Sequence, residues 1–325
     1  MTIFSMIIPV KELNDYVRET VPYILQLDFV DWELFIVTNE DQNTEWPNEA
    51  RIKMMSSGRV GPAEKRDIAA AVATGEYLVF LDDDSYPEPN LLSLAFEKFA
   101  EGAVALGGPA VTPHSDSFKQ KVSGAVFSSK ITGGSPERYR PVGHQREVDD
   151  WPSVNLMVSR QIFLKIGGFN SPYWPGEDTF LCLKLLRAGH RVTYVPKLIV
   201  WHHRREGLLR HIKQVGAYGL HRGYFARHLP ETSRRIQYMF PSLVFLMFLS
   251  APIAIVLPAI LQRFVVLGLL MYLFGVILGV SNMMRFEKKT VALAALPYVI
   301  ATHLSYGYWF LRGLLLRGQL VSKLR

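Results

Sequence analysis

The sequence has almost no cysteine, and it has no repeated segments. Its single cysteine, Cys182, excludes an intramolecular disulfide, and with it the class of small disulfide-stapled secreted proteins. It contains no internal repeat, low-complexity tract or nucleic-acid-binding motif. Residues 1–10 are too short, and run too soon into charged side chains, to form a signal peptide. We therefore expect the N-terminal part of the chain to remain in the cytoplasm.

Long apolar runs are scarce before Phe240 and frequent after it. Residues 240–261, 264–284 and 291–311 each have about the 20 residues needed to cross a bilayer, and none contains Asp, Glu, Lys or Arg. Region 240–325 therefore predicts a multi-pass protein of the inner (cytoplasmic) membrane. Three full spans would put the basic C-terminus outside, against the positive-inside rule. We expect two full spans, a third segment that lies in the interface or re-enters, and a cytoplasmic C-terminus.

Much of the net charge of +7 lies between Arg204 and Arg235. Across residues 206–239, Arg, Lys and His alternate with Leu, Ile, Tyr and Phe, which is typical of a basic amphipathic helix on a membrane surface. Such helices would contact membrane lipid and offer cations to a lipid diphosphate. The alternative is a solvated basic linker.

Three consecutive carboxylates, Asp82, Asp83 and Asp84, follow the apolar run at 77–81. The run predicts a strand buried on both faces of a parallel sheet, and the carboxyl end of such a strand faces the ligand crevice. Adjacent carboxylates repel one another unless a cation neutralises them, and hard oxygen ligands favour Mg²⁺ or Mn²⁺. An acidic loop that caps the next helix is the alternative.

Strand and helix patterns alternate along the first 205 residues. Buried-strand runs at 4–10, 33–38, 51–55 and 77–81 are separated by helix patterns at 14–27 and 61–73. This order predicts an α/β fold with a Rossmann-like, mostly parallel sheet in a domain over residues 1–205. Residues 112–151 show little periodicity and predict an excursion that covers the substrate.

Two further motifs follow. Gly176-Glu177-Asp178 precedes a helix pattern, and His202-His203 follows a strand pattern. Each has an ordinary explanation by itself, since acidic residues stabilise a helix N-terminus and histidine pairs are common at surfaces.

In this order the acidic triplet, the Glu-Asp pair and the His pair resemble the family 2 inverting glycosyltransferases of GT-A fold. Gly61-Pro62-Ala63 with a nearby basic residue resembles the family's Gly-x-Ala-x-x-Arg turn, and residues 166–169 its Gly-Gly-Phe segment. The resemblance covers about residues 3–205. The remainder is similar to the membrane-anchored branch that builds bacterial exopolysaccharide and capsule, including the succinoglycan type, through residues 218–222 and 305–307.

The resemblance implies a role for each site residue. Asp82 and Asp84 would bind Mg²⁺ or Mn²⁺, with His202 as the third protein ligand or a diphosphate contact. Asp178 would be the general base that takes the acceptor's proton, and Glu177 would orient it. Contacts to the nucleotide-diphosphate sugar are expected at Pro9, Lys11, Asn39, Lys65, Arg66, Asp82 and Asp83.

Two departures from the family pattern bear on specificity. Residues 38–41 read Thr-Asn-Glu-Asp where the family usually has one base-reading Asp, so the nucleotide base stays open. No Gln-x-x-Arg-Trp follows the His pair, which predicts a non-processive enzyme. The expected acceptor is a polyprenyl-diphosphate-linked saccharide. The alternatives are a polyprenyl-phosphate sugar synthase, which attacks with a phosphate oxygen, and a non-catalytic membrane scaffold.

Overall fold

The computed structural model describes residues 2–254, 256 and 258–320, which form two compact units. Residues 2–113 and 140–203 form an α/β unit, and residues 114–139 and 204–320 form a helical unit. The division differs from the expected boundary at 205 because residues 114–139 pack with the C-terminal helices. The C-terminal end, 321–325, for which a cytoplasmic location was expected, lies outside the described residues.

An eight-stranded sheet organises the α/β unit, with the strand order β3-β2-β1-β4-β9-β6-β10-β8. Pairs β3/β2, β2/β1, β1/β4 and β6/β10 are parallel, whereas β9 runs antiparallel to β4 and β6, and β8 antiparallel to β10. The predicted mostly parallel sheet of a GT-A-like fold is confirmed. Its strands are β1 Phe4–Pro9, β2 Trp32–Thr38, β3 Ile52–Ser56, β4 Tyr77–Leu81, β6 Ala105–Gly107, β8 Arg146–Val148, β9 Asn155–Ser159 and β10 Val192–Tyr194.

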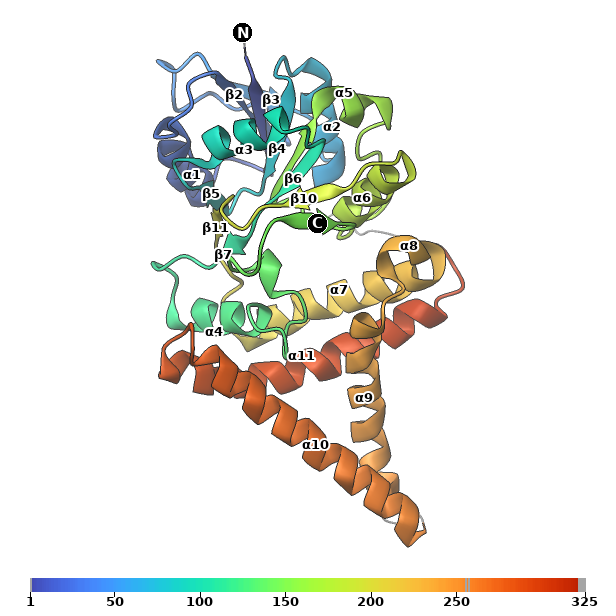
Figure 1. Cartoon of the computed structure of the whole chain (residues 1–325). Coiled ribbons are helices and arrows are strands. Elements are labelled where there is room, and N and C mark those ends of the chain that lie inside the picture. The colour runs from blue at the N-terminus through green and yellow to red at the C-terminus, as the bar shows by residue number, and fades with distance from the viewer. Residues whose placement is uncertain (1, 255, 257, 321–325) are drawn as a thin grey trace. The chain divides into compact units, whose positions relative to one another are not determined.

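Helices cover both faces of this sheet (Figure 1). Side chains of β1 alternate between the faces: Met6 and Ile8 pack with α1 and α3, while Ile7 packs with α2, α5 and α6. Strands buried on both sides in this way read as continuous apolar runs, which is why the sequence located them. The helices are α1 Asp15–Leu25, α2 Pro62–Val72, α3 Leu91–Ala100, α5 Arg160–Lys165 and α6 Glu177–Arg187.

A second, three-stranded sheet of order β5-β11-β7 begins where β4 ends. Its strands are β5 Ser85–Pro87, β7 Ala110–Val111 and β11 Val200–His202. The antiparallel register pairs His202 with Ser85. It thereby joins the acidic triplet to a segment more than a hundred residues later in the chain.

The helical unit contains a helix that the sequence did not predict. Within the supposedly aperiodic region 112–151, α4 runs from Phe118 to Phe127 and begins with a capping box between Ser117 and Gln120. Residues 122–127 are all buried, so this half of the helix shows no amphipathic periodicity, and the helix packs against α7 and α11. A 3₁₀ turn at Pro136–Arg138 follows.

The remaining elements are α7 Leu208–His228, α8 Pro230–Ser233, α9 Ile236–Ala254, α10 Ala259–Met283 and α11 Lys289–Leu315. By length and composition, α9 and α10 are the two described helices that could cross a membrane. The segment 291–311 forms most of α11, which packs closely along α7. Glycines make this contact close: a Cβ at Gly219 would lie 2.7 Å from the Tyr306 carbonyl oxygen, and one at Gly223 would overlap that of Phe310.

Candidate active site

The acidic triplet forms a tight turn between β4 and β5. The hydroxyl of Ser85 accepts a hydrogen bond from the Asp82 backbone nitrogen (3.1 Å) and donates one to the Asp82 carbonyl oxygen (2.8 Å). Asp84 is buried, Asp82 half-buried, and Asp83 accepts a hydrogen bond from the Asn14 side chain (2.7 Å). The carboxylates therefore lie at the carboxyl end of β4, as predicted from the sequence.

Pairing of β11 with β5 brings His202 to this turn. Its Nε2 lies 3.0 Å from Oδ1 of Asp84, and the His203 backbone nitrogen donates to the Asp84 carbonyl oxygen (3.0 Å). Ligand atoms of Asp82, Asp84 and His202 all lie within 4.8 Å of one another. Two carboxylate oxygens with one imidazole nitrogen fit a divalent ion such as Mn²⁺, which accepts both kinds of donor.

The two histidines have different surroundings. His203 places its Nε2 3.1 Å from a carboxylate oxygen of Glu19, on α1, and its ring packs beside Tyr16. Only His202 belongs to the carboxylate cluster within the described part of the chain.

Arg66, on α2, bridges the triplet and the Glu-Asp pair. Its guanidinium lies 2.6 Å from Oδ1 of Asp82 and 3.3 Å from Oε1 of Glu177. The side chain is fully buried and faces the ring of Phe169, 5.5 Å away. Arg66, predicted to contact the nucleotide-diphosphate sugar, holds these two carboxylates through its two terminal nitrogens, one nitrogen to each.

Glu177 and Asp178 occupy the first turn of α6, directly after Gly176, whose φ of 112° favours glycine. Glu177 is buried, and its pKa is raised, first by burial and then by the neighbouring Asp178 carboxylate. Asp178 is half-buried and accepts a hydrogen bond from the Thr179 backbone nitrogen (2.7 Å). Of the two, Asp178 is the more accessible to a substrate.

Lys65 lies at the carboxyl ends of β1 and β2, where its ammonium group contacts the carbonyl oxygen of Val10 and Oδ1 of Asn39 (2.7 Å). Burial lowers its pKa to about 8. Pro9 ends β1 and Lys11 is exposed just beyond it. Lys65 thus links the ends of β1 and β2 at the edge of the sheet where the sequence predicts the nucleotide contacts.

Sequence reasoning missed two supporting residues. Asn14 caps α1 through its side-chain oxygen and donates its amide to Asp83. Asp67 accepts hydrogen bonds from the backbone nitrogens of Phe169 and Asn170, both at 2.7 Å, and so fixes the turn whose Phe169 ring packs on Arg66. An N-cap asparagine before an apolar helix is a readable signal. Nothing local marks Asp67.

Comparison with known proteins finds a family profile that matches the N-terminal half of the chain. Residues 5–164 match the sequence profile of Glycosyl transferase family 2. The pre-mycofactocin glycosyltransferase of Mycobacterium tuberculosis is 29% identical over 159 residues, which is 49% of this chain and 33% of that protein. The chain thus spans about a third of that relative's length. The succinoglycan biosynthesis protein ExoA of Rhizobium meliloti is 25% identical over 253 residues, 77% of this chain and 65% of that protein.

A solved structure supports the fold. The mannosyltransferase PcManGT from Pyrobaculum calidifontis, solved with GDP-Man and Mn²⁺, aligns with a TM-score of 0.55 at 15% identity, over 92% of this chain and 85% of its own. The profile match includes the acidic triplet at 82–84, and the solved structure supports the GT-A-like fold. Residues 5–164 are thus similar to a glycosyl transferase family 2 domain, and the fold is GT-A-like.

Proposed function

We propose that the chain is a metal-dependent inverting glycosyltransferase that moves a sugar from a nucleotide-diphosphate sugar to a polyprenyl-diphosphate-linked saccharide. The observation that carries the proposal is the cluster of Asp82, Asp84 and His202, joined through Arg66 to the Glu-Asp pair on α6. Metal site and base candidate therefore belong to one connected group of side chains. An ordinary acidic loop would not need that connection.

Asp82, Asp84 and His202 would hold Mn²⁺ or Mg²⁺, which neutralises the charge that develops on the departing diphosphate. Asp178 takes the proton of the acceptor hydroxyl while the oxygen of that hydroxyl bonds to C1 of the donor sugar. The bond from C1 to the diphosphate oxygen breaks, and the diphosphate leaves with the electron pair. Attack opposite the leaving group inverts the configuration. Glu177, held by Arg66, keeps the first turn of α6 in place for this step.

The proposal extends to location and pathway class. Helices α9 and α10 would anchor the enzyme in the inner membrane as two spans, with the α/β unit and the C-terminus in the cytoplasm and residues 206–239 at the lipid surface. The similarity to a succinoglycan biosynthesis protein supports a role in cell-surface polysaccharide synthesis. Absence of a Gln-x-x-Arg-Trp motif supports transfer of one sugar per encounter.

A thermal-shift screen of nucleotides and nucleotide sugars, with and without Mn²⁺, tests the proposal. A nucleotide at a hundred times its dissociation constant stabilises the fold by about 2.7 kcal/mol, which corresponds to a rise in Tm of roughly 5–11 °C for a domain of this size. Asp84→Ala should remove the Mn²⁺-dependent part of the rise and leave the fold intact, because it deletes one ligand and relieves carboxylate repulsion.

The matched control is Asp31→Ala, which removes an exposed carboxylate just before β2. This variant should respond to Mn²⁺ and nucleotide as the wild-type protein does. An unchanged nucleotide affinity of Asp84→Ala in Mn²⁺ would refute the metal site.

A further inference from the structure

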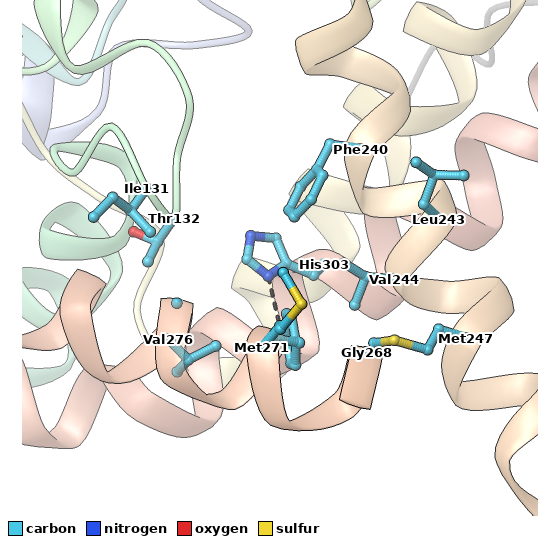
Figure 2. Close-up of a pocket in the computed structure, with 12 residues that line it drawn as sticks. Ile131, Thr132, Phe240, Leu243, Val244, Met247, Gly268, Met271, Val276 and His303 are labelled. Carbon is cyan, nitrogen blue, oxygen red and sulfur yellow. Dashed lines mark hydrogen bonds between the residues drawn. The ribbon is translucent and has the colours of Figure 1, made fainter. Parts of the chain in front are cut away.

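The helical unit holds an apolar pocket that the proposed chemistry does not use. Its volume is about 330 Å³, near the lower end of ligand pockets, roughly 300–1,000 Å³. Figure 2 shows His303 of α11 in its middle, with Phe240 and Val244 of α9 and Met271 and Val276 of α10 around it. The turn at 131–132 closes one side. Other lining residues are Leu243, Met247, Gly268, Tyr272 and Gly275.

Close packing holds the wall at 131–132 in place. A Cβ at Gly279 of α10 would lie 2.7 Å from Thr132 Cγ2 and 3.3 Å from Ile131 Cγ2, so this glycine lets the turn rest directly on the helix. The hydroxyl of Thr132 donates to the Val126 carbonyl oxygen at the end of α4 (2.9 Å). The pocket is therefore built by packed elements on several sides.

One turn away, Gly275 is under no such constraint. Nothing lies within 4 Å of the position that its Cβ would take, although it lines the pocket. A helix is less stable with glycine than with alanine at an interior position, and no neighbouring atom at Gly275 requires a glycine. Its effect is to leave space inside the pocket.

The chemistry of the lining selects the ligand. Its polar side chains include Tyr272 and His303, whose hydroxyl and Nδ1 are 3.1 Å apart and satisfy each other. None of the twelve described lining residues is Asp, Glu, Lys or Arg, so the pocket offers no ion pair to a charged headgroup. Such a site suits a hydrocarbon chain.

We propose that this pocket binds the isoprenoid chain of the lipid carrier to which the acceptor saccharide is attached, an inference that rests on the proposed function. Its walls belong largely to α9 and α10, the helices long and apolar enough to cross a membrane, so hydrocarbon is the medium they would meet. Met247 and Met271 are in the lining, and flexible thioether side chains fill irregular apolar space, as a methyl-branched chain requires.

Photolabelling of the full chain in detergent micelles tests the inference. The probe is farnesyl phosphate with a diazirine at the end of the chain, and labelled residues are mapped by mass spectrometry. Labelling is expected on lining residues of the pocket. Unlabelled long-chain polyprenyl phosphate should compete, whereas dioleoyl phosphatidylglycerol should not.

Gly275→Leu should reduce the labelling by about tenfold or more, since a filled cavity leaves no volume for the chain. The control Ile277→Phe adds bulk on the same helix at an exposed side chain outside the lining and should label normally. Labelling elsewhere, undiminished labelling of Gly275→Leu in a protein with wild-type Tm, or equal competition by the phospholipid would each overturn the inference. Mn²⁺-dependent nucleotide binding of the same samples tests the glycosyltransferase proposal separately.

Discussion

Replacing Arg66 by methionine tests whether Arg66 is a structural bridge between two carboxylates or an ordinary surface cation. In the wild-type protein the buried guanidinium contacts Asp82 at 2.6 Å and Glu177 at 3.3 Å. Methionine has a similar length but no charge, so the variant would leave the buried Glu177 carboxylate without its cationic partner. The Asp82 carboxylate would remain better hydrated than that of Glu177, since the Asp82 side chain is 35% exposed.

Breaking a buried ion pair by removing one partner costs about 3–5 kcal/mol in free energy of unfolding. For a unit of this size the corresponding fall in Tm is roughly 6–20 °C, at about 2–4 °C per kcal/mol. The cost arises mainly from the stranded carboxylate. Arg66→Met combined with Glu177→Gln should therefore regain part of the lost Tm, because the neutral amide is cheaper to bury.

Thermal unfolding of the full chain in detergent, followed by circular dichroism, measures the effect. The matched control is Arg18→Met on α1, where the guanidinium is 44% exposed and pairs with Asp15 and Glu45 at the surface. Exposed pairs contribute little, so this variant should unfold close to the wild-type temperature. If Arg66→Met also unfolds close to the wild-type temperature, or if adding Glu177→Gln restores none of the lost Tm, Arg66 does not act as a buried bridge.

Three further outcomes are expected. Asp178→Asn should keep Mn²⁺-dependent nucleotide binding but lower transfer to a hydroxyl acceptor by about 10²–10⁴-fold, since an amide accepts no proton; transfer retained with a polyprenyl phosphate would instead indicate the phosphate-acceptor alternative. Gly223→Ala should lower stability by about 1–3 kcal/mol through overlap with Phe310, whereas Gly275→Ala, with nothing within 4 Å, should not lower Tm; equal Tm values would count against a tight contact between α7 and α11. Burial lowers the pKa of His211 from 6.5 to about 4, so the unfolded chain takes up the proton first and stability should fall from pH 6.5 to pH 4; a slope unchanged in His211→Gln would contradict this.

Local patterns in the sequence determined much of the α/β unit. A strand buried on both faces must be apolar along its whole length, so β1, β2 and β4 were readable, and with them the edge of the sheet where Asp82 to Asp84 lie. The Glu-Asp pair at the start of α6 was readable because acidic side chains and a preceding glycine mark a helix N-terminus. The apolar composition of α9 and α10 likewise marked them as the candidate spans.

Tertiary structure decided what depends on contacts between distant residues. The antiparallel register of β5 and β11 selected His202 over His203 for the carboxylate cluster, and no property of the dipeptide itself distinguishes the two. Helix α4 was missed because residues 122–127 are all buried, so no amphipathic pattern marks the helix, which packs against α7 and α11. Arg66 carries the same charge in the sequence whether it binds a diphosphate or two carboxylates of its own chain. Only the fold, by placing Asp82 and Glu177 on either side of its guanidinium, shows that Arg66 bridges these two carboxylates.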